Sequence, residues 1–107
     1  MNTYRIIRDN GIDLEFSAEI IGFAEGSQKN IIGYHIDSTT LTTLLLYKTA
    51  GGKYICEKIT QNDTYPSKNK SRAIVSSGAT QIYKFFGTGA LATQLYKMAA
   101  LPVQFVD

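Results

Sequence analysis

The sequence has a single cysteine, Cys56, and this scarcity excludes two kinds of site. One cysteine cannot form a disulfide within the chain, and it cannot supply the several thiolates of a metal cluster. An unpaired thiol also suits a reducing compartment better than a secretory route. We therefore expect a cytoplasmic protein, and we assign it no metal and no cofactor.

Long hydrophobic runs are missing as well. The N-terminal segment MNTYRIIRDNG lacks the apolar stretch of a signal peptide, and no run approaches the ~18 apolar residues of a membrane span. Tryptophan is absent, although seven Tyr and five Phe supply large apolar groups. The sequence therefore predicts a soluble protein without a membrane partner.

The residues that are present fit one globular domain, residues 1–107. The chain has 107 residues, of which 44% are hydrophobic, and this is enough for a modest core. Its net charge of +2 is unevenly divided: the first 47 residues hold three basic and six acidic residues, and the remainder holds eight basic and three acidic. This asymmetry fits attraction between subunits, recognition of an anion, or simply two solvated faces.

The N-terminal part of the chain has the pattern of β-structure. Residues 3–8 are predicted to form a short strand, and DNG at 9–11 predicts a hairpin turn. Residues 12–20 alternate between apolar and polar side chains, as a half-buried strand does. The alternation breaks at Ile20 and Ile21, where we expect a bulge or bend.

The following segments are more polar. Residues 25–30 are interpreted as a turn, and residues 31–37 as a third strand weakened by a glycine. Residues 61–72 contain a proline and no periodicity, so they are interpreted as an exposed loop.

A second hairpin is predicted from residues 41–47 and 54–59, with its turn within 49–52. In this register Leu46 lies opposite Ile55, and both faces of the hairpin carry apolar side chains. One face is expected to pack under C-terminal helices. We expect a second copy of the chain to cover the other face, with a ligand pocket or the chain's own tail as alternatives. The predicted homodimer interface consists of Leu45, Tyr47, Tyr54 and Cys56.

The C-terminal part changes to a helical period. Residues 79–86 place apolar side chains at helical spacing, although their aromatic and β-branched content also fits a strand. Residues 88–101 are predicted to form a helix that Pro102 ends, and the tail 103–107 to add an edge strand or tuck across the core. The sequence thus predicts an α+β fold, an antiparallel sheet of about five strands packed against one or two C-terminal helices.

Residues 87–92, GTGALA, match the G-x-G-x-x-G/A pattern of dinucleotide-binding folds, and Asp107 supplies a later acid. Too few residues follow for the further parallel strands of such a fold. We therefore interpret the segment as a turn between two helices. A ligand or anion at Gly87, Thr88 and Gly89 is the alternative, because helix amino-termini attract phosphate.

A small basic cluster lies in the polar segment at residues 65–72. Lys68, Lys70 and Arg72 follow Tyr65, and they predict phosphate contacts with the tyrosine stacked on a base. A solubilising loop is the alternative interpretation, because three charges are few for a nucleic-acid site.

His35 is the only histidine, and on a strand its side chain projects from the same side as Asp37. An enzyme built on this pair would need Cys56 as its nucleophile, but the apolar neighbours of Cys56 disfavour a thiolate. We expect an inert buried cysteine and a surface histidine, with an enzyme or small-ligand site near His35 as the alternative. Asp13, Glu15 and Glu19 belong to the polar side of a strand and receive no role.

Residues 46–54, LYKTAGGKY, and residues 85–99, FFGTGALATQLYKMA, resemble small bacterial proteins of unassigned function. Those proteins share an LYxTxGGxY hairpin and a short helical C-terminus. The resemblance implies a bacterial or mobile-element origin and no particular activity. The sequence as a whole predicts a non-enzymatic binding module that forms a homodimer, with nucleic-acid binding through residues 65–72 as the alternative.

Overall fold

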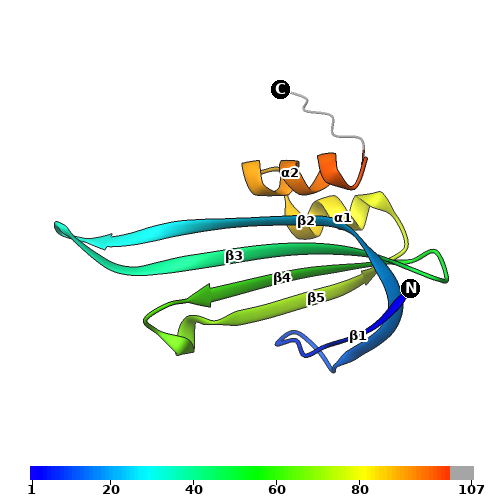
Figure 1. The fold of residues 1–107 in the computed structure, drawn as a ribbon, viewed down its shortest axis with the longest axis horizontal. Coiled ribbons are helices and arrows are strands. Elements are labelled where there is room, and N and C mark those ends of the chain that lie inside the picture. Colours follow the sequence, from blue (N-terminus) through cyan, green and yellow to red (C-terminus); the bar gives the residue numbers. More distant parts are fainter. Residues whose placement is uncertain (102–107) are drawn as a thin grey trace.

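The computed structural model describes residues 1–101 and confirms the α+β fold, a five-stranded antiparallel sheet followed by two helices (Figure 1). The strands pair in chain order, each with the strand that precedes it. The elements are β1 (Asn2–Ile6), β2 (Leu14–Ile32), β3 (His35–Thr49), β4 (Tyr54–Asn62), the 3-10 helix η1 (Pro66–Lys68), β5 (Lys70–Ser76), α1 (Ala79–Phe86) and α2 (Ala90–Met98). Pro102 and the tail 103–107, for which an edge strand or a segment across the core was predicted, lie outside the described residues.

Two stretches that were interpreted as irregular are largely strand. Residues 25–30 continue β2 along β3, so the predicted turn is wrong. Residues 61–72 contain the end of β4 and the beginning of β5, with η1 between them. Both stretches are rich in polar side chains, which hides the apolar alternation that identifies a strand.

The helical interpretation of residues 79–86 is confirmed. Gly87 ends α1 with a positive φ of 80°, a conformation that glycine adopts without steric cost. Gly89 precedes the first turn of α2, so this helix begins two residues later than predicted. The bulge expected near Ile20 is also present, because the pairing of β2 with β3 shifts between Ile20 and Gly22.

The sheet curls, and residues 7–13 tie β1 to the far strand β5. The amide of Asp9 donates to the carbonyl of Ser71 at 2.6 Å. The side-chain amide of Asn10 donates to the Ala73 carbonyl at 3.0 Å and accepts from the Ala73 amide at 3.1 Å. The side-chain amide of Asn10 therefore makes the two hydrogen bonds that the backbone of a neighbouring strand would make. The tight turn expected at 9–11 is instead a broad loop.

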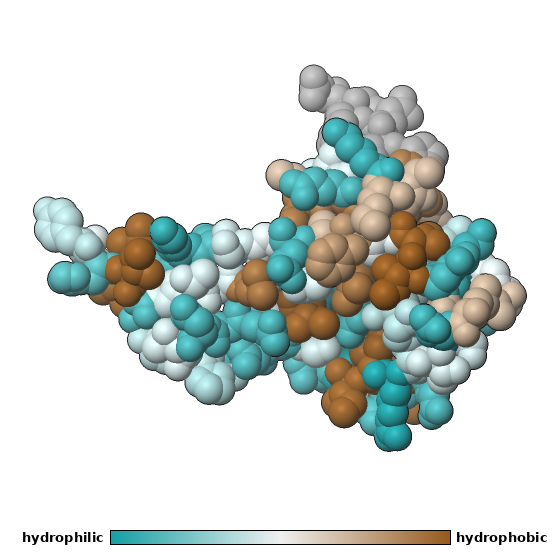
Figure 2. All heavy atoms as spheres, in the orientation of Figure 1, coloured by the Kyte–Doolittle hydropathy of each residue, from teal (hydrophilic) through white to brown (hydrophobic). Residues whose placement is uncertain are grey.

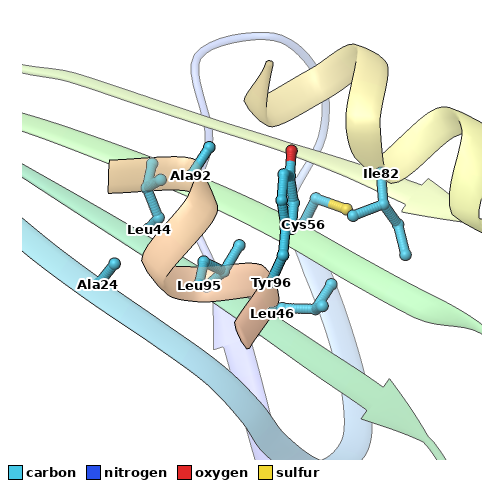
Figure 3. Close-up of a cluster of buried hydrophobic side chains, with 8 residues drawn as sticks. All are labelled: Ala24, Leu44, Leu46, Cys56, Ile82, Ala92, Leu95 and Tyr96. Carbon is cyan, nitrogen blue, oxygen red and sulfur yellow. The ribbon is translucent and has the colours of Figure 1, made fainter. Parts of the chain in front are cut away.

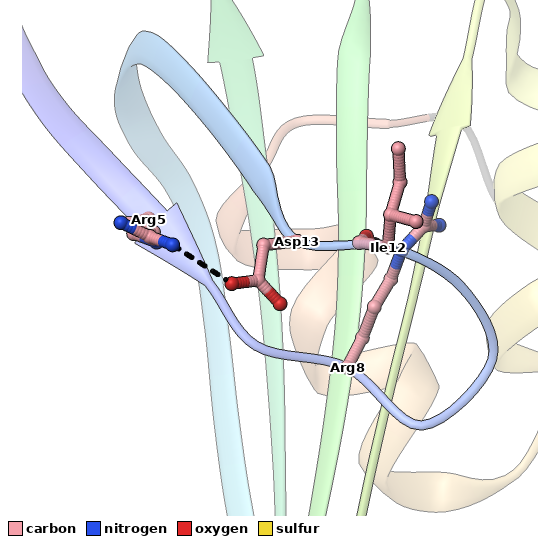
Figure 4. Close-up of polar contacts among 4 residues, drawn as sticks. All are labelled: Arg5, Arg8, Ile12 and Asp13. Atoms are coloured by element: carbon pink, nitrogen blue, oxygen red, sulfur yellow. Dashed lines mark hydrogen bonds and ion pairs between the residues drawn. The ribbon is translucent and has the colours of Figure 1, made fainter.

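Two arginines brace this loop (Figure 4). The Arg8 guanidinium donates to the carbonyl of Ile12 at 2.8 Å and to that of Ala73 at 2.7 Å. Arg5 forms an ion pair with Asp13 at 3.1 Å on the exposed side of the same loop. The contact of Arg8 with Ala73 is the more important for closure, because it reaches β5 itself.

Helices α1 and α2 cover one face of the sheet (Figure 3). Buried side chains from three strands meet buried side chains from both helices, and the Tyr96 hydroxyl donates to the Gly87 carbonyl at 2.5 Å. We call this face the helix face. Its buried residues are Ala24, Leu44, Leu46, Cys56, Ile82, Ala92, Leu95 and Tyr96.

The N-terminal hairpin covers the opposite face, which we call the hairpin face. The rings of Tyr4, Phe16 and Tyr47 pack together there, with centroids 4.9 to 5.8 Å apart. Ring pairs at this spacing add to the stabilisation that burial itself provides. The buried residues of this second cluster are Ile6, Ala18, Tyr47, Ile55 and Ala73.

The predicted register of β3 with β4 is wrong by one residue. Leu46 pairs with Cys56 and Tyr47 pairs with Ile55, so every β4 side chain lies on the face opposite to the one expected. Tyr47 then belongs to the hairpin face and Cys56 to the helix face, and both are buried within one chain. Of the predicted interface residues, Leu45 and Tyr47 therefore lie on the hairpin face and Tyr54 and Cys56 on the helix face, so the four do not form one surface.

Helix α2 approaches β2 closely because glycines lie beneath it. A Cβ atom on Gly22 would lie 3.0 Å from Leu95 Cδ1 and 3.3 Å from Ala99 Cβ. On Gly26 it would lie 3.4 Å from Leu91 Cδ1, an ordinary contact distance. The space above Gly22 is thus filled, whereas Gly26 tolerates a methyl group.

We expect Gly22→Val to lower the free energy of unfolding by about 2 kcal/mol, because the added methyl groups overpack the contact with α2. Gly26→Ala serves as the matched control and is expected to change it by less than about 0.5 kcal/mol. Urea unfolding followed by circular dichroism measures both. Equal stability of Gly22→Val and the wild type would contradict this packing.

Candidate nucleic-acid interface

Basic side chains gather on the helix face of the sheet, beside α1. Lys58 pairs with Arg72, and Thr60 pairs with Lys70, across β4 and β5. Directly opposed residues of an antiparallel pair project from the same face, so the three cations lie together. Lys84 adds a fourth from the adjacent helix. We call this surface the basic groove; it comprises Lys58, Thr60, Lys70, Arg72, Lys84 and Phe85.

Two hollows form the basic groove, and Arg72 lines both. The larger has a volume of about 450 Å³ and lies between β5 and α1, where Lys84 and Phe85 border it. The smaller, of about 250 Å³, lies over the paired strands and is lined by Lys58, Thr60, Lys70 and Arg72. None of the described residues that line either hollow is acidic. The surface is therefore suited to an anion.

An aromatic ring lies beside these charges. The Arg72 guanidinium carbon is 5.9 Å from the centroid of the Phe85 ring, within the range of a cation–π contact. The Phe85 ring is stacked on Phe86, with centroids 5.1 Å apart and planes 4° from parallel. This contact fixes Phe85 as a half-buried platform at the edge of the groove. Arginine and a platform of this kind are the groups that bind the backbone and the bases of nucleic acids.

The structure divides the predicted basic cluster. Lys70 and Arg72 lie in the basic groove. Tyr65 and Lys68 belong instead to the turn around η1, where the Lys68 ammonium is 4.7 Å from the centre of the Tyr65 ring. The Tyr65 hydroxyl donates to the Asp37 carboxylate at 2.6 Å, and this hydrogen bond raises the pKa of Tyr65. The ring is thus held by its own chain.

Sequence reasoning missed three groove residues. Lys58 was missed because Lys70 and Arg72 were assigned to a loop, so no strand was expected beside residue 58. Lys84 and Phe85 were weighed only as parts of a helix or strand, with no sign that α1 would lie beside β5. Only the pairing of β4 with β5 places Lys58 opposite Arg72.

The Gly87–Gly89 segment is the turn between α1 and α2. Gly87 ends one helix and Gly89 precedes the next, and the carbonyl of Gly89 accepts from both the amide and the hydroxyl of Thr93 at 2.9 Å. Thr88 is exposed between them. The arrangement is the helix–helix turn of the first interpretation.

His35, Asp37 and Cys56 are not brought together. His35 is exposed at the end of the β2–β3 hairpin, and the Asp37 carboxylate accepts from Tyr65. Cys56 lies under the helices, where burial raises the pKa of its thiol to about 12. Within residues 1–101, no group of three or more His, Cys, Asp or Glu residues is placed to hold a metal ion.

One buried carboxylate lies on the hairpin face. Glu57 is 6% exposed and accepts a hydrogen bond of 2.8 Å from the Tyr47 hydroxyl. Burial raises the pKa of Glu57, and the tyrosine hydrogen bond opposes that rise in part. Burial and the same carboxylate also raise the pKa of Tyr47. Both groups are enclosed by apolar side chains, so their contact belongs to the core.

The chain was compared with known proteins. No family model, no curated protein and no solved structure matches it. Of the helices described, none has the length and apolar content needed to cross a membrane.

We expect Glu57→Gln to raise the melting temperature at pH 7 by about 3 °C. A carboxyl group whose pKa is raised by folding stabilises the protein below its unfolded pKa and loses that contribution as the pH rises through its folded pKa. Glutamine carries no charge to desolvate, and its carbonyl still accepts from Tyr47. Thermal unfolding between pH 4 and pH 8 measures the effect. A variant with the wild-type dependence on pH would contradict it.

Proposed function

We propose that this protein is a non-enzymatic binding module whose ligand is single-stranded nucleic acid, held in the basic groove. The observation that carries the proposal is the convergence of four cations from β4, β5 and α1 on one hollowed surface without an acidic neighbour in its described lining. Sequence-independent binding of nucleic acids depends on such contacts between lysine or arginine and phosphate.

The arrangement along β5 favours an extended polymer over a single phosphate. Lys70 and Arg72 are two residues apart on one strand, so their backbones are separated by about 6.7 Å. This separation resembles that between neighbouring phosphates of an extended strand. The hollows continue from this pair toward Lys84, so several successive phosphates can be contacted.

The ring of Phe85 favours a single strand over a duplex. A base can stack on an aromatic platform only when it is free of its own stacked neighbours, which is the case in single strands. Arg72 lies between the ring and the lysines. One side chain is therefore placed to contact a phosphate next to the base that stacks.

A cytoplasmic location is part of the proposal. Cys56 is buried as a free thiol, which suits a reducing compartment. Its raised pKa and its position under the helices support a packing role rather than a catalytic one.

The test is a titration of the full chain against a fluorescein-labelled 20-nucleotide oligothymidylate, read by fluorescence anisotropy. We expect the logarithm of the association constant to fall with the logarithm of salt concentration with a slope of about −3, since four phosphates are neutralised on a single strand. Arg72→Glu is expected to weaken binding at least tenfold at 50 mM salt and to flatten the slope.

Lys53→Glu is the matched control, because it also replaces a basic residue with glutamate, but at the β3–β4 turn, outside the groove. It is expected to bind within about twofold of the wild type at moderate salt. Binding by Arg72→Glu that equals that of Lys53→Glu would overturn the assignment of the groove. Absence of salt-sensitive binding by the wild type would overturn the function itself.

A further inference from the structure

The outer edge of β2 is open over most of its length. β1 pairs only with residues 14–18 of this strand, whereas β2 continues to Ile32. In the part of the chain that the structure describes, no other strand lies along the outer edge of residues 19–32. An open edge presents backbone N–H and C=O groups that another strand can pair with.

Apolar side chains lie exposed at both ends of this edge. Near the body of the molecule, Ile20 is 43% and Phe23 is 44% exposed. At the far end, Ile31 is 65% exposed and Tyr34 is fully exposed. Figure 2 shows the hydrophobic patch near the end of the projecting β2–β3 hairpin, separate from the body. A strand docked along the edge would cover both groups.

Opposite charges lie between the two apolar ends. Side chains alternate along the strand, so Glu25 and Lys29 lie on the same face as Phe23 and Ile31. Glu25 accepts a hydrogen bond from the Thr43 hydroxyl at 3.1 Å. Among the described residues the ion pair is between Arg5 and Asp13, so neither Glu25 nor Lys29 has an oppositely charged partner in that part of the chain.

These residues are self-complementary about Ser27. When two copies of β2 are aligned antiparallel with Ser27 opposite itself, Glu25 lies opposite Lys29 of the second copy. Phe23 then lies opposite Ile31 of the second copy, and two-fold symmetry repeats each pair. A shift of register by one or two residues removes the pairing of Glu25 with Lys29. The second copy is therefore the occupant that the charges and apolar groups of this edge fit.

Helix α2 packs on one face of β2 at one end of this segment. Leu95 lies over Gly22 and Leu91 over Gly26, so α2 covers the helix face of residues 22–26, opposite to the face that carries Phe23 and Glu25. The two-fold axis places the second α2 over the other half of the interface. The two helices therefore lie diagonally across the axis, with their amino-terminal ends nearest to it.

We propose that the protein forms a two-fold symmetric homodimer in which residues 22–32 of β2 pair antiparallel with the same residues of a second copy. The two sheets become one continuous sheet, which is a common way for an open edge to be completed. The interface lies on β2, whereas the basic groove lies on β4, β5 and α1, so this inference stands independently of the proposed function.

The charge pair provides the sharpest test. Sedimentation equilibrium of the full chain between 1 and 200 µM is expected to show twice the mass of 11.8 kDa for the wild type. Glu25→Lys and Lys29→Glu each set like charges opposite one another on both sides of the two-fold axis, and each is expected to raise the dimer dissociation constant at least tenfold. The double variant exchanges the two charges, and its dimer dissociation constant is expected to return to within about threefold of the wild-type value.

The same experiment can overturn the proposal. The proposal is overturned if the wild-type protein is a monomer throughout this range. A monomer is also the result expected if residues 102–107, and not a second copy, occupied the edge. A dimer that the single variants do not weaken, or that the double variant does not restore, would place the interface elsewhere. Lys53→Glu controls for a general effect of charge, and circular dichroism verifies that each variant is folded.

A crosslink tests the alignment directly. Ser27→Cys places one thiol from each copy beside the two-fold axis, where opposed Cβ atoms are about 4.5 to 5.5 Å apart. Mild oxidation is expected to convert most of this variant to a disulfide-linked dimer, whereas Cys56 is buried and does not compete. Gln61→Cys, an exposed position on β4, is the control and is expected to remain uncrosslinked. Equal crosslinking of the two variants would overturn the register.

Discussion

The structure depends on the hydrogen bonds that join residues 7–10 to the outer edge of β5. Asn10 bonds both backbone groups of Ala73, Arg8 reaches the same carbonyl, and Asp9 pairs with Ser71. These contacts hold the N-terminal hairpin against the sheet. Because of them Tyr47 and Ile55 are buried in one chain, and the sheet has a core on each face.

The sequence predicted the composition of the fold better than its geometry. The alternation in residues 12–20 and the glycine turn after β3 identified strands correctly, and of the two structures left open for residues 79–86 the helix is the one that forms. The register of β4 was missed because apolar side chains lie on both of its faces, so a slip of one residue leaves the pattern equally apolar. The extension of β2 through residues 25–30 was missed because its side chains there are polar.

The same reasons explain how much of the candidate site was predicted. Lys70 and Arg72 were recognised because they are close in sequence to Lys68, but local spacing contains no information about the partner strand. Lys58 and Lys84 come from elements that only the tertiary fold brings beside Arg72. The exposed edge of β2 was likewise invisible, because the short length of β1 relative to β2 appears only in the pairing.

The Asn10–Ala73 contact also has a consequence for folding during translation. The two residues are 63 positions apart, whereas strands β2 to β4 pair with sequence neighbours. On the ribosome the N-terminal hairpin emerges first, yet it has no edge to close upon until β5 has been synthesised. The meander can assemble progressively, and the final closure waits for β5, so the N-terminal hairpin of a nascent chain stays unclosed until residues 70–76 have been synthesised.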